Sequence, residues 1–285
     1  LKAQHLEVPD YSLTGDDLFV EIDSDHLNLL ESGNWPNIRL AAKNIAIDQF
    51  TLNTPVVDID LGEHPKLAFH GTSGSLGGAA DFEGYINTQN KSGSIHALGS
   101  LNLIGMVPYK VRERLPKIIF EASPYYQIKL NLNPGFTLGE ANIKADVNKL
   151  QVDEFTFEHI AASASYKDGI YTIRDLNINR KKQNLYLDFS YDTSSYDYRA
   201  ALIGSIIPDD YNTLLPPWWA SVFRDFDFGQ CQNISGDFII YGNAQSKSTD
   251  LYYGRAQAHN ISYKDVTLDQ IDSIVRGYSG YTELD

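Results

Sequence analysis

The sequence predicts an all-β fold dominated by antiparallel strands, with two short helices. Apolar and polar residues alternate with a period of two over many short segments, which places one set of side chains on each face of a sheet. Residues typical of turns separate these segments roughly every eight to twelve residues. Only two short segments have the spacing of apolar residues that favours a helix.

The clearest hairpin is predicted over 184–204, where Leu185, Leu187 and Phe189 alternate with polar residues. A second strand follows the turn residues of 192–195, since Asp, Thr and Ser favour turns. The same pattern predicts further strands over 45–62, 93–105, 125–135, 237–243 and 250–263.

The two helices are predicted near 107–118 and 209–227. Asp209 or Asp210 provides a possible N-cap for the second helix. Pro216 and Pro217 must interrupt or restart that helix, because proline suits only a first helical turn.

An internal duplication is predicted from features that recur at a nearly constant offset. The tripeptide Tyr-Lys-Asp occurs at 166–168 and again at 263–265, and short aromatic or apolar runs occur at 118–120 and 226–228. Such spacing indicates a supersecondary unit used twice. Three residue pairs are each separated by 100 positions: Pro108 and Pro208, Leu115 and Leu215, and Pro116 and Pro216. We therefore divide the chain into an N-terminal β region over 1–92, a first β-meander repeat over 93–192 and a second over 193–285.

Composition excludes several classes of protein. Of the 285 residues, 21% are charged and 42% are hydrophobic, as expected of a globular protein. The formal net charge of −14 argues against nucleic-acid binding and against electrostatic docking on an anionic membrane, because both need basic surface. Cys231 is the only cysteine, so the chain cannot form an internal disulfide. No apolar run of about 18 residues is present, and the chain begins without Met, so we expect a fragment whose membrane anchor lies outside it.

No motif predicts catalysis, a cofactor or a metal. The glycine-rich segment over 71–78 lacks the Gly-Lys-Ser/Thr ending of a phosphate-binding loop. The seven histidines are scattered rather than placed at metal-ligand spacing, and no Gly-x-Ser-x-Gly motif is present. Acidic residues such as Asp58 and Asp188 fall on the polar phase of strands, so we expect a protein that is not an enzyme.

Two segments of the second half resemble the AsmA-like family, which includes the large TamB-type envelope proteins. Residues 155–192 contain a strand, a Tyr-x-Asp-Gly turn, a strand ending in Asp-Leu-x-Ile and a further hairpin. Residues 234–271 contain a Gly-x-x-x-x-x-Gly strand followed by Gly-x-Ala-x-Ala-x-x-Ile-x-Tyr. The first pattern is similar to the repeated unit of that family, and the second is similar to its C-terminal pattern.

The resemblance implies a long, strongly curved antiparallel sheet, folded like a taco or a solenoid-like groove with an apolar concave face. Proteins of this kind carry phospholipids or other acyl lipids along such a groove, or help to maintain the outer membrane. The resemblance also implies a periplasmic location and an inner-membrane anchor, which we expect outside this fragment. No nucleic-acid partner and no cofactor are expected.

The apolar phase of the best strands supplies the predicted lining of this groove, while the two short helices supply residues to plug or gate it. The predicted lining is Ile128, Leu130, Leu132, Phe155, Phe157, Leu185, Leu187, Phe189, Ile239 and Tyr241. The predicted plug or gate is Leu115, Trp218 and Phe223.

Two alternatives stay open at this point. Alternation alone does not distinguish an open greasy groove from two apolar faces that close on each other as a dry sandwich core. The 18 tyrosines would also suit a carbohydrate-binding or adhesive β-solenoid without a lipid groove, because tyrosine rings favour strands and wet interfaces.

Overall fold

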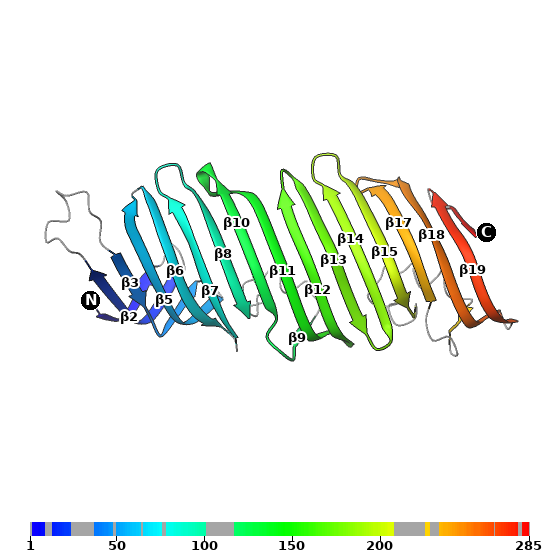
Figure 1. Cartoon of the computed structure of the whole chain (residues 1–285), viewed down its shortest axis with the longest axis horizontal. Coiled ribbons are helices and arrows are strands. Elements are labelled where there is room, and N and C mark those ends of the chain that lie inside the picture. The colour runs from blue at the N-terminus through cyan, green and yellow to red at the C-terminus, as the bar shows by residue number, and fades with distance from the viewer. Residues whose placement is uncertain are drawn as a thin grey trace. The chain divides into compact units, whose positions relative to one another are not determined.

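The computed structural model shows an all-β chain, as the sequence predicts. It describes residues 2–8, 13–23, 37–47, 50–63, 65–75, 78–100, 117–207, 226–228, 234–264, 266–278 and 281–284. In these ranges the secondary structure consists of β-strands and one 3₁₀ turn, η3 (Pro134–Phe136). All strand pairs with a described register are antiparallel, and Figure 1 labels most of the strands.

The two predicted helices are not seen, and their described ends are strands. Ile118, the last residue of the first predicted helix, begins strand β9 (Ile118–Phe120), and the end of the second predicted helix forms β16 (Phe226–Asp227). Branched and aromatic side chains at these positions favour an extended backbone over a helical one. The remainder, 107–116 and 209–225, lies outside the described residues.

The chain divides into two units. Residues 1–156 and 165–168 form the first, and residues 157–164 and 169–285 form the second. Strand β12 (Phe155–Lys167) contributes residues to both. The boundaries predicted at 92/93 and 192/193 rest on repeated patterns rather than on contacts, and they stay a prediction.

The first unit is a meander in which most strands pair with their neighbours in sequence. Its order is β1, β2, then β3 and β4 sharing one position, then β5, β6, β7, β8, β10 and β11. The strands are β1 (Lys2–Val8), β2 (Leu13–Asp23), β3 (Asn37–Ala41), β4 (Asn44–Ile47), β5 (Phe50–Glu63), β6 (Lys66–Ser75), β7 (Gly78–Asn87), β8 (Ser92–Ser100), β10 (Tyr125–Asn133) and β11 (Thr137–Val152).

The second unit repeats this organisation with fewer strands. Its order is β13, β14, β15, β17, β18, β19 and β20. The strands are β13 (Ile170–Arg180), β14 (Gln183–Asp192), β15 (Asp197–Ile206), β17 (Ile234–Asn243), β18 (Ser246–Tyr263), β19 (Val266–Tyr278) and β20 (Tyr281–Leu284). The hairpin of β14 and β15 confirms the strongest hairpin prediction.

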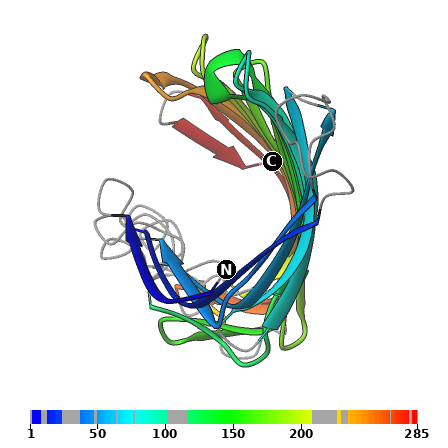
Figure 2. The same ribbon diagram turned by 90° about the vertical axis from the view of Figure 1, so that its left-hand side faces the viewer.

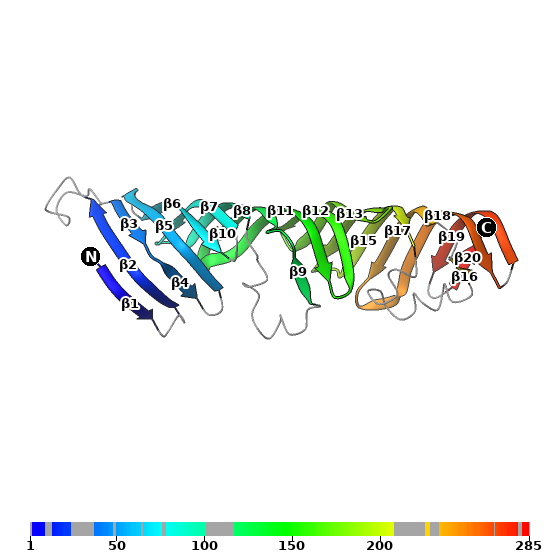
Figure 3. The ribbon, with the colours of Figure 1, turned by 90° about the horizontal axis from the view of Figure 1, so that it is seen from below.

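Each unit contains a short strand paired with the end of a long one. In the first unit β9 pairs with the end of β11, and the next strand, β10, pairs with β8 and β11. In the second unit β16 pairs with the end of β18, and the next strand, β17, pairs with β15 and β18. Figure 3 labels both short strands.

A glycine with an unusual backbone conformation lies near the end of β8 and another near the end of β15, the strands that precede β9 and β16. Gly99 has φ of 147° and Gly204 has φ of 152°, a region that side chains rarely permit. A Cβ atom on Gly204 would lie 2.9 Å from Cα of Leu185, and one on Gly99 would lie 2.5 Å from Cα of Ala80. Each glycine is in the strand that precedes a short strand, β9 or β16, and an internal duplication of the chain stays a prediction.

The repeated Tyr-Lys-Asp tripeptide lies at a hairpin turn in both places. Asp168 and Gly169, with φ of 51° and 83°, form the turn between β12 and β13. The turn between β18 and β19 includes Lys264, with φ of 45°. The first turn therefore begins at the third residue of the tripeptide, Asp168, whereas the second begins at the second residue, Lys264.

Bulges interrupt the long strands and bend them. The register shifts in β10 between Asn131 and Leu132, and in β13 between Ile173 and Leu176. In the β13 bulge, Asp175 has φ of 53°, and its N–H donates to Oδ1 of Asp188 at 2.9 Å. An extra residue bends its strand locally, and the strands of the first unit, which also has register shifts between β5 and β6, are curved in Figure 2.

Candidate functional site

The second unit presents an apolar face that crosses consecutive strands. Leu187 of β14 lies opposite Leu202 of β15, which lies opposite Phe238 of β17. Phe238 pairs with Gly254 of β18, and Gly254 pairs with Val275 of β19. Paired residues share a face, so these side chains form one row. The apolar face of the second unit comprises Ile173, Leu176, Ile178, Leu185, Leu187, Phe189, Leu202, Ile206, Ile234, Phe238, Ile240, Tyr252, Ile271 and Val275, all partly buried.

The first unit has an apolar face of the same kind. Phe82 of β7 lies opposite Ala97 of β8, which lies opposite Ile128 of β10, and Ile128 pairs with Ile143 of β11. The apolar face of the first unit comprises Ile38, Leu40, Val57, Ile59, Leu67, Phe69, Phe82, Ile86, Ile95, Ala97, Ile128, Leu130 and Ile143, all partly buried.

The opposite face of the first unit is polar and carries cross-strand charge pairs. Nε2 of His70 lies 3.4 Å from Oδ2 of Asp58, and Nδ1 of His96 lies 3.4 Å from Oε1 of Glu83. Such exposed pairs contribute little to stability, about 0–1 kcal/mol each, but they keep this face hydrated. The directly opposed residues of one row are Glu21, Arg39, Asp58, His70, Glu83, His96 and Lys129.

Aromatic rings of both apolar faces lie over glycines of the neighbouring strand. In the first unit, a Cβ atom on Gly71 would lie 2.8 Å from Cζ of Phe82, and one on Gly84 would lie 2.8 Å from Cζ of Phe69. These are directly opposed pairs in the register. A ring that covers a glycine protects the bare backbone and lies close to the sheet.

The second unit uses the same device. A Cβ atom on Gly254 would collide with the ring of Phe238, and one on Gly277 would collide with the ring of Tyr252. Both glycines are the direct partners of these aromatic residues. The aromatic rings of both apolar faces therefore lie against the sheet rather than projecting away from it.

Among the described residues, the apolar faces lack a covering layer of secondary structure. The strands of each unit contact chiefly the strands beside them in the sheet. No described helix or second sheet packs on either face, in contrast to a β-sandwich, in which two sheets bury their inner faces. The side chains are half-buried because they pack sideways on one another.

Phe228 is the side chain that covers part of the second apolar face. It is 5% exposed and packs with Ala258 and Ile261, which are 4% and 2% exposed. Phe228 directly follows β16, and because β16 pairs with the end of β18, Phe228 lies near that end. The partly buried residues around this cluster are Ile207, Ile234, Leu268 and Ile271.

Polar side chains bound the apolar face of the second unit near both ends of its strands. Burial and a hydrogen bond to Asp250 raise the pKa of Tyr198 to about 12. Gln183, toward the other end, is 3% exposed, and its Oε1 accepts a hydrogen bond from the N–H of Ile207 at 3.2 Å. The uncovered apolar surface thus lies between these two polar borders.

The structure places six of the predicted lining residues on the two apolar faces. Ile128, Leu130 and Leu132 lie on that of the first unit, and Leu185, Leu187 and Phe189 lie on that of the second. That these residues line a groove stays a prediction.

Leu132 pairs with Gly93 of β8 in unbroken register with Leu130, so it stays on the apolar face of the first unit, where it is partly buried. Two further predicted lining residues occupy another place. Phe155 and Phe157 of β12 are 7% and 6% exposed. Their burial shows that neither ring is on an open surface.

The last two predicted lining residues, Ile239 and Tyr241 of β17, lie on the opposite face. They are 36% and 46% exposed, and the register pairs Ile239 with Ala201 and Tyr241 with Arg199. Phe238 and Ile240 occupy the apolar face instead. The run Phe-Ile-Ile-Tyr is apolar in both phases, so only the register with β15 decides which phase is covered.

The predicted plug residues Leu115, Trp218 and Phe223 lie outside the described residues. Sequence reasoning missed Phe228 as a covering residue, although the run at 226–228 had marked a strand at this point. It also missed the aromatic–glycine pairs, which depend on residues that meet only when the strands are in register.

Comparisons with known proteins identify no relative. No family model matches this sequence, and neither the curated proteins nor the solved structures contain a match.

In the described ranges no group of three or more His, Cys, Asp or Glu side chains is arranged to hold a metal ion. No described helix has the length and apolar character needed to cross a membrane.

Proposed function

We propose that this chain shelters lipid acyl chains on its apolar sheet faces, as a non-enzymatic protein of the cell envelope. The AsmA-like resemblance suggests phospholipid transport or outer-membrane maintenance in the periplasm as the setting. The observation that carries the proposal is a half-buried apolar face in each unit that no described layer of secondary structure covers.

The energetics favour an acyl ligand. Each methylene group moved from water onto an apolar surface contributes about 0.8 kcal/mol. Rings that lie over Gly254 and Gly277 leave a surface of low relief, on which a linear chain makes similar contacts at many positions. Similar contacts along the surface favour sliding over tight binding at one point.

A pair of adjacent residues offers a direct test. Leu202 lies on the apolar face of the second unit, whereas Ile203 is 60% exposed on the opposite face. We expect Leu202→Glu to lose the lipid held by the second unit, because a carboxylate on an apolar face excludes acyl chains. We expect Ile203→Glu to keep the wild-type amount. The measurement is native mass spectrometry with lipid extraction after purification from a Gram-negative host without detergent.

Circular dichroism and thermal midpoints serve to show that both variants keep the β fold. Equal lipid loss in the two variants, or a wild-type protein that carries no lipid and takes up no fluorescent phospholipid, would contradict the proposal. Loss confined to Leu202→Glu would assign the lipid to the apolar face.

A further inference from the structure

A second candidate binding site lies on the polar face of the second unit. An open depression of about 480 Å³ is centred on β15 and β17, where Ser205 lies opposite Ser235. The side chains of these two serines are small and leave room above this face of the sheet, and the neighbouring Gly204 and Gly236 also line the depression. The larger residues that line the depression are Asn184, Tyr186, Ile203, Asp237, Arg255 and Gln257.

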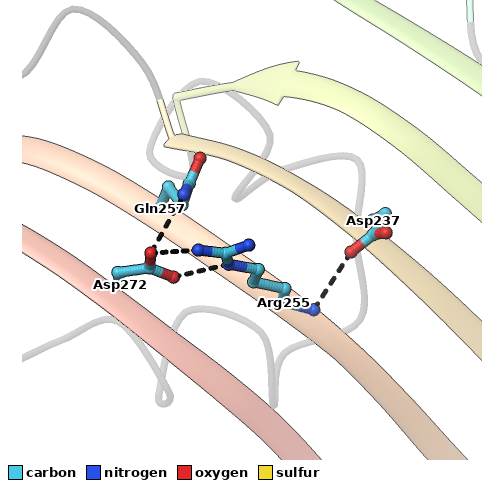
Figure 4. Close-up of polar contacts among 4 residues, drawn as sticks. All are labelled: Asp237, Arg255, Gln257 and Asp272. Carbon is cyan, nitrogen blue, oxygen red and sulfur yellow. Dashed lines mark hydrogen bonds and ion pairs between the residues drawn. The ribbon is translucent and has the colours of Figure 1, made fainter.

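The polar groups of this depression are held in place by one another. The carboxylate of Asp272 accepts hydrogen bonds from Nε of Arg255 at 2.7 Å, from Nη2 of the same guanidinium, and from Nε2 of Gln257 at 3.1 Å. The backbone N–H of Arg255 donates to Oδ1 of Asp237 at 3.2 Å (Figure 4). The Arg255 guanidinium has five N–H donors, and Asp272 accepts from only part of that fork.

Apolar surface borders the same depression. Tyr186 is 46% exposed and Ile203 is 60% exposed. Beyond Arg255 on the same face of β18 lies Tyr253, which is 56% exposed, and Tyr278 and Tyr241 follow at 59% and 46%. Exposed aromatic rings beside fixed polar groups are suited to a ligand that has both an apolar face and hydroxyl groups.

We infer that this depression, together with Tyr253, binds a neutral oligosaccharide. A pyranose ring has an apolar face for stacking on tyrosine and hydroxyl groups that fit amide, carboxylate and guanidinium partners. The polar cluster carries two carboxylates, Asp237 and Asp272, and one guanidinium, that of Arg255, so it has no spare positive charge for an anionic ligand. The net charge of −14 further disfavours an anionic ligand. This site is on the face opposite the proposed lipid surface, so the two proposals stand or fall separately.

Three neutral tetrasaccharides test the inference: maltotetraose, cellotetraose and chitotetraose, titrated by calorimetry and by saturation-transfer NMR. We expect at least one to bind with a Kd at or below about 1 mM. Tyr186→Ala and Arg255→Leu should each weaken this binding at least about tenfold, as expected when a buried contact of a small ligand is removed. Tyr85→Ala serves as the matched control, because Tyr85 is an exposed tyrosine on the polar face of the first unit.

Three outcomes would overturn the inference. The first is no binding of any tetrasaccharide in this range, and the second is binding that both variants leave unchanged. The third is self-association of the wild-type protein that Tyr253→Ala abolishes, which would assign the tyrosines to a protein interface. Retained lipid loading in Tyr186→Ala would show in the same preparations that the lipid proposal is unaffected.

Discussion

Individual glycines determine how the aromatic side chains of the apolar faces lie. Phe238 covers Gly254, and a side chain at that glycine would displace the ring from the sheet. Gly135 contrasts with this, because its φ of 80° serves a turn and nothing lies within 4 Å of its Cβ position. Glycine thus has two separate uses here, one for the fit of a ring and one for a turn of the backbone.

The pH dependence of one ion pair gives a prediction at this scale. Hydrogen bonds from Arg255 and then Gln257 lower the pKa of Asp272 from 3.8 to about 2. A carboxyl group with a lowered pKa stabilises the folded state above its unfolded pKa, and this contribution is lost as the pH falls through the folded value. We therefore expect wild type to exceed Asp272→Asn in Tm by a constant amount above about pH 5, and by a shrinking amount from about pH 4 to pH 2.

Thermal melts of both proteins over this pH range provide the measurement. Asp269→Asn is the control, since Asp269 is an exposed carboxylate of the same strand, β19. A difference in Tm between wild type and Asp272→Asn that stays constant down to about pH 2 would show that the ion pair does not contribute as described.

At the scale of elements, the short strand β16 gives the second unit its most buried hydrophobic cluster. Strand β16 pairs with the end of β18, and the next residue, Phe228, packs on Ala258 and Ile261. The short strand thus positions one aromatic side chain over the end of the apolar face.

Truncation of Phe228 is expected to destabilise the protein strongly. Removal of a buried Phe side chain costs about 3–5 kcal/mol, because transfer energy is lost and a cavity remains. Phe136→Ala is the matched control: this side chain is 47% exposed, and a surface substitution changes stability by only about 0.5 kcal/mol. The midpoint of urea unfolding should fall for Phe228→Ala and hardly change for Phe136→Ala. Equal midpoints for the two variants would show that Phe228 does not pack as described.

The sequence predicts where the strands lie better than it predicts which side chains lie on each face of the sheet. Alternation identifies strands such as β14 because Leu185, Leu187 and Phe189 are separated by polar residues. It fails in β17, where Phe238 and Ile239 are both apolar and the register with β15 decides the phase. It cannot pair Phe238 with Gly254 either, because hydrogen bonding between strands sets that contact.

For the whole molecule, the two units share one chemical organisation. Each has an apolar face and an opposite face rich in polar groups, and each contains a short strand, β9 or β16, that pairs with the end of a long strand. The formal net charge of −14 favours solubility of a chain that leaves so much apolar sheet uncovered by described secondary structure.

If each unit shelters acyl chains by itself, the lipid load should respond to each face separately. Leu130 lies on the apolar face of the first unit and Leu202 on that of the second. We expect Leu130→Glu and Leu202→Glu each to remove about half of the bound lipid, and the double variant to remove nearly all, because effects at independent sites add. The measurement is the molar ratio of extracted phospholipid to protein.

Matched polar-face variants are Gln127→Glu in β10 and Ile203→Glu in β15, both at exposed positions, and both should keep the full ratio. Complete loss in one single variant with no loss in the other would show that only one unit binds lipid. Complete loss in both single variants would mean that the two faces act as one site. A ratio that falls by half in each single variant, and to nearly zero in the double variant, is the result that two similar apolar faces require.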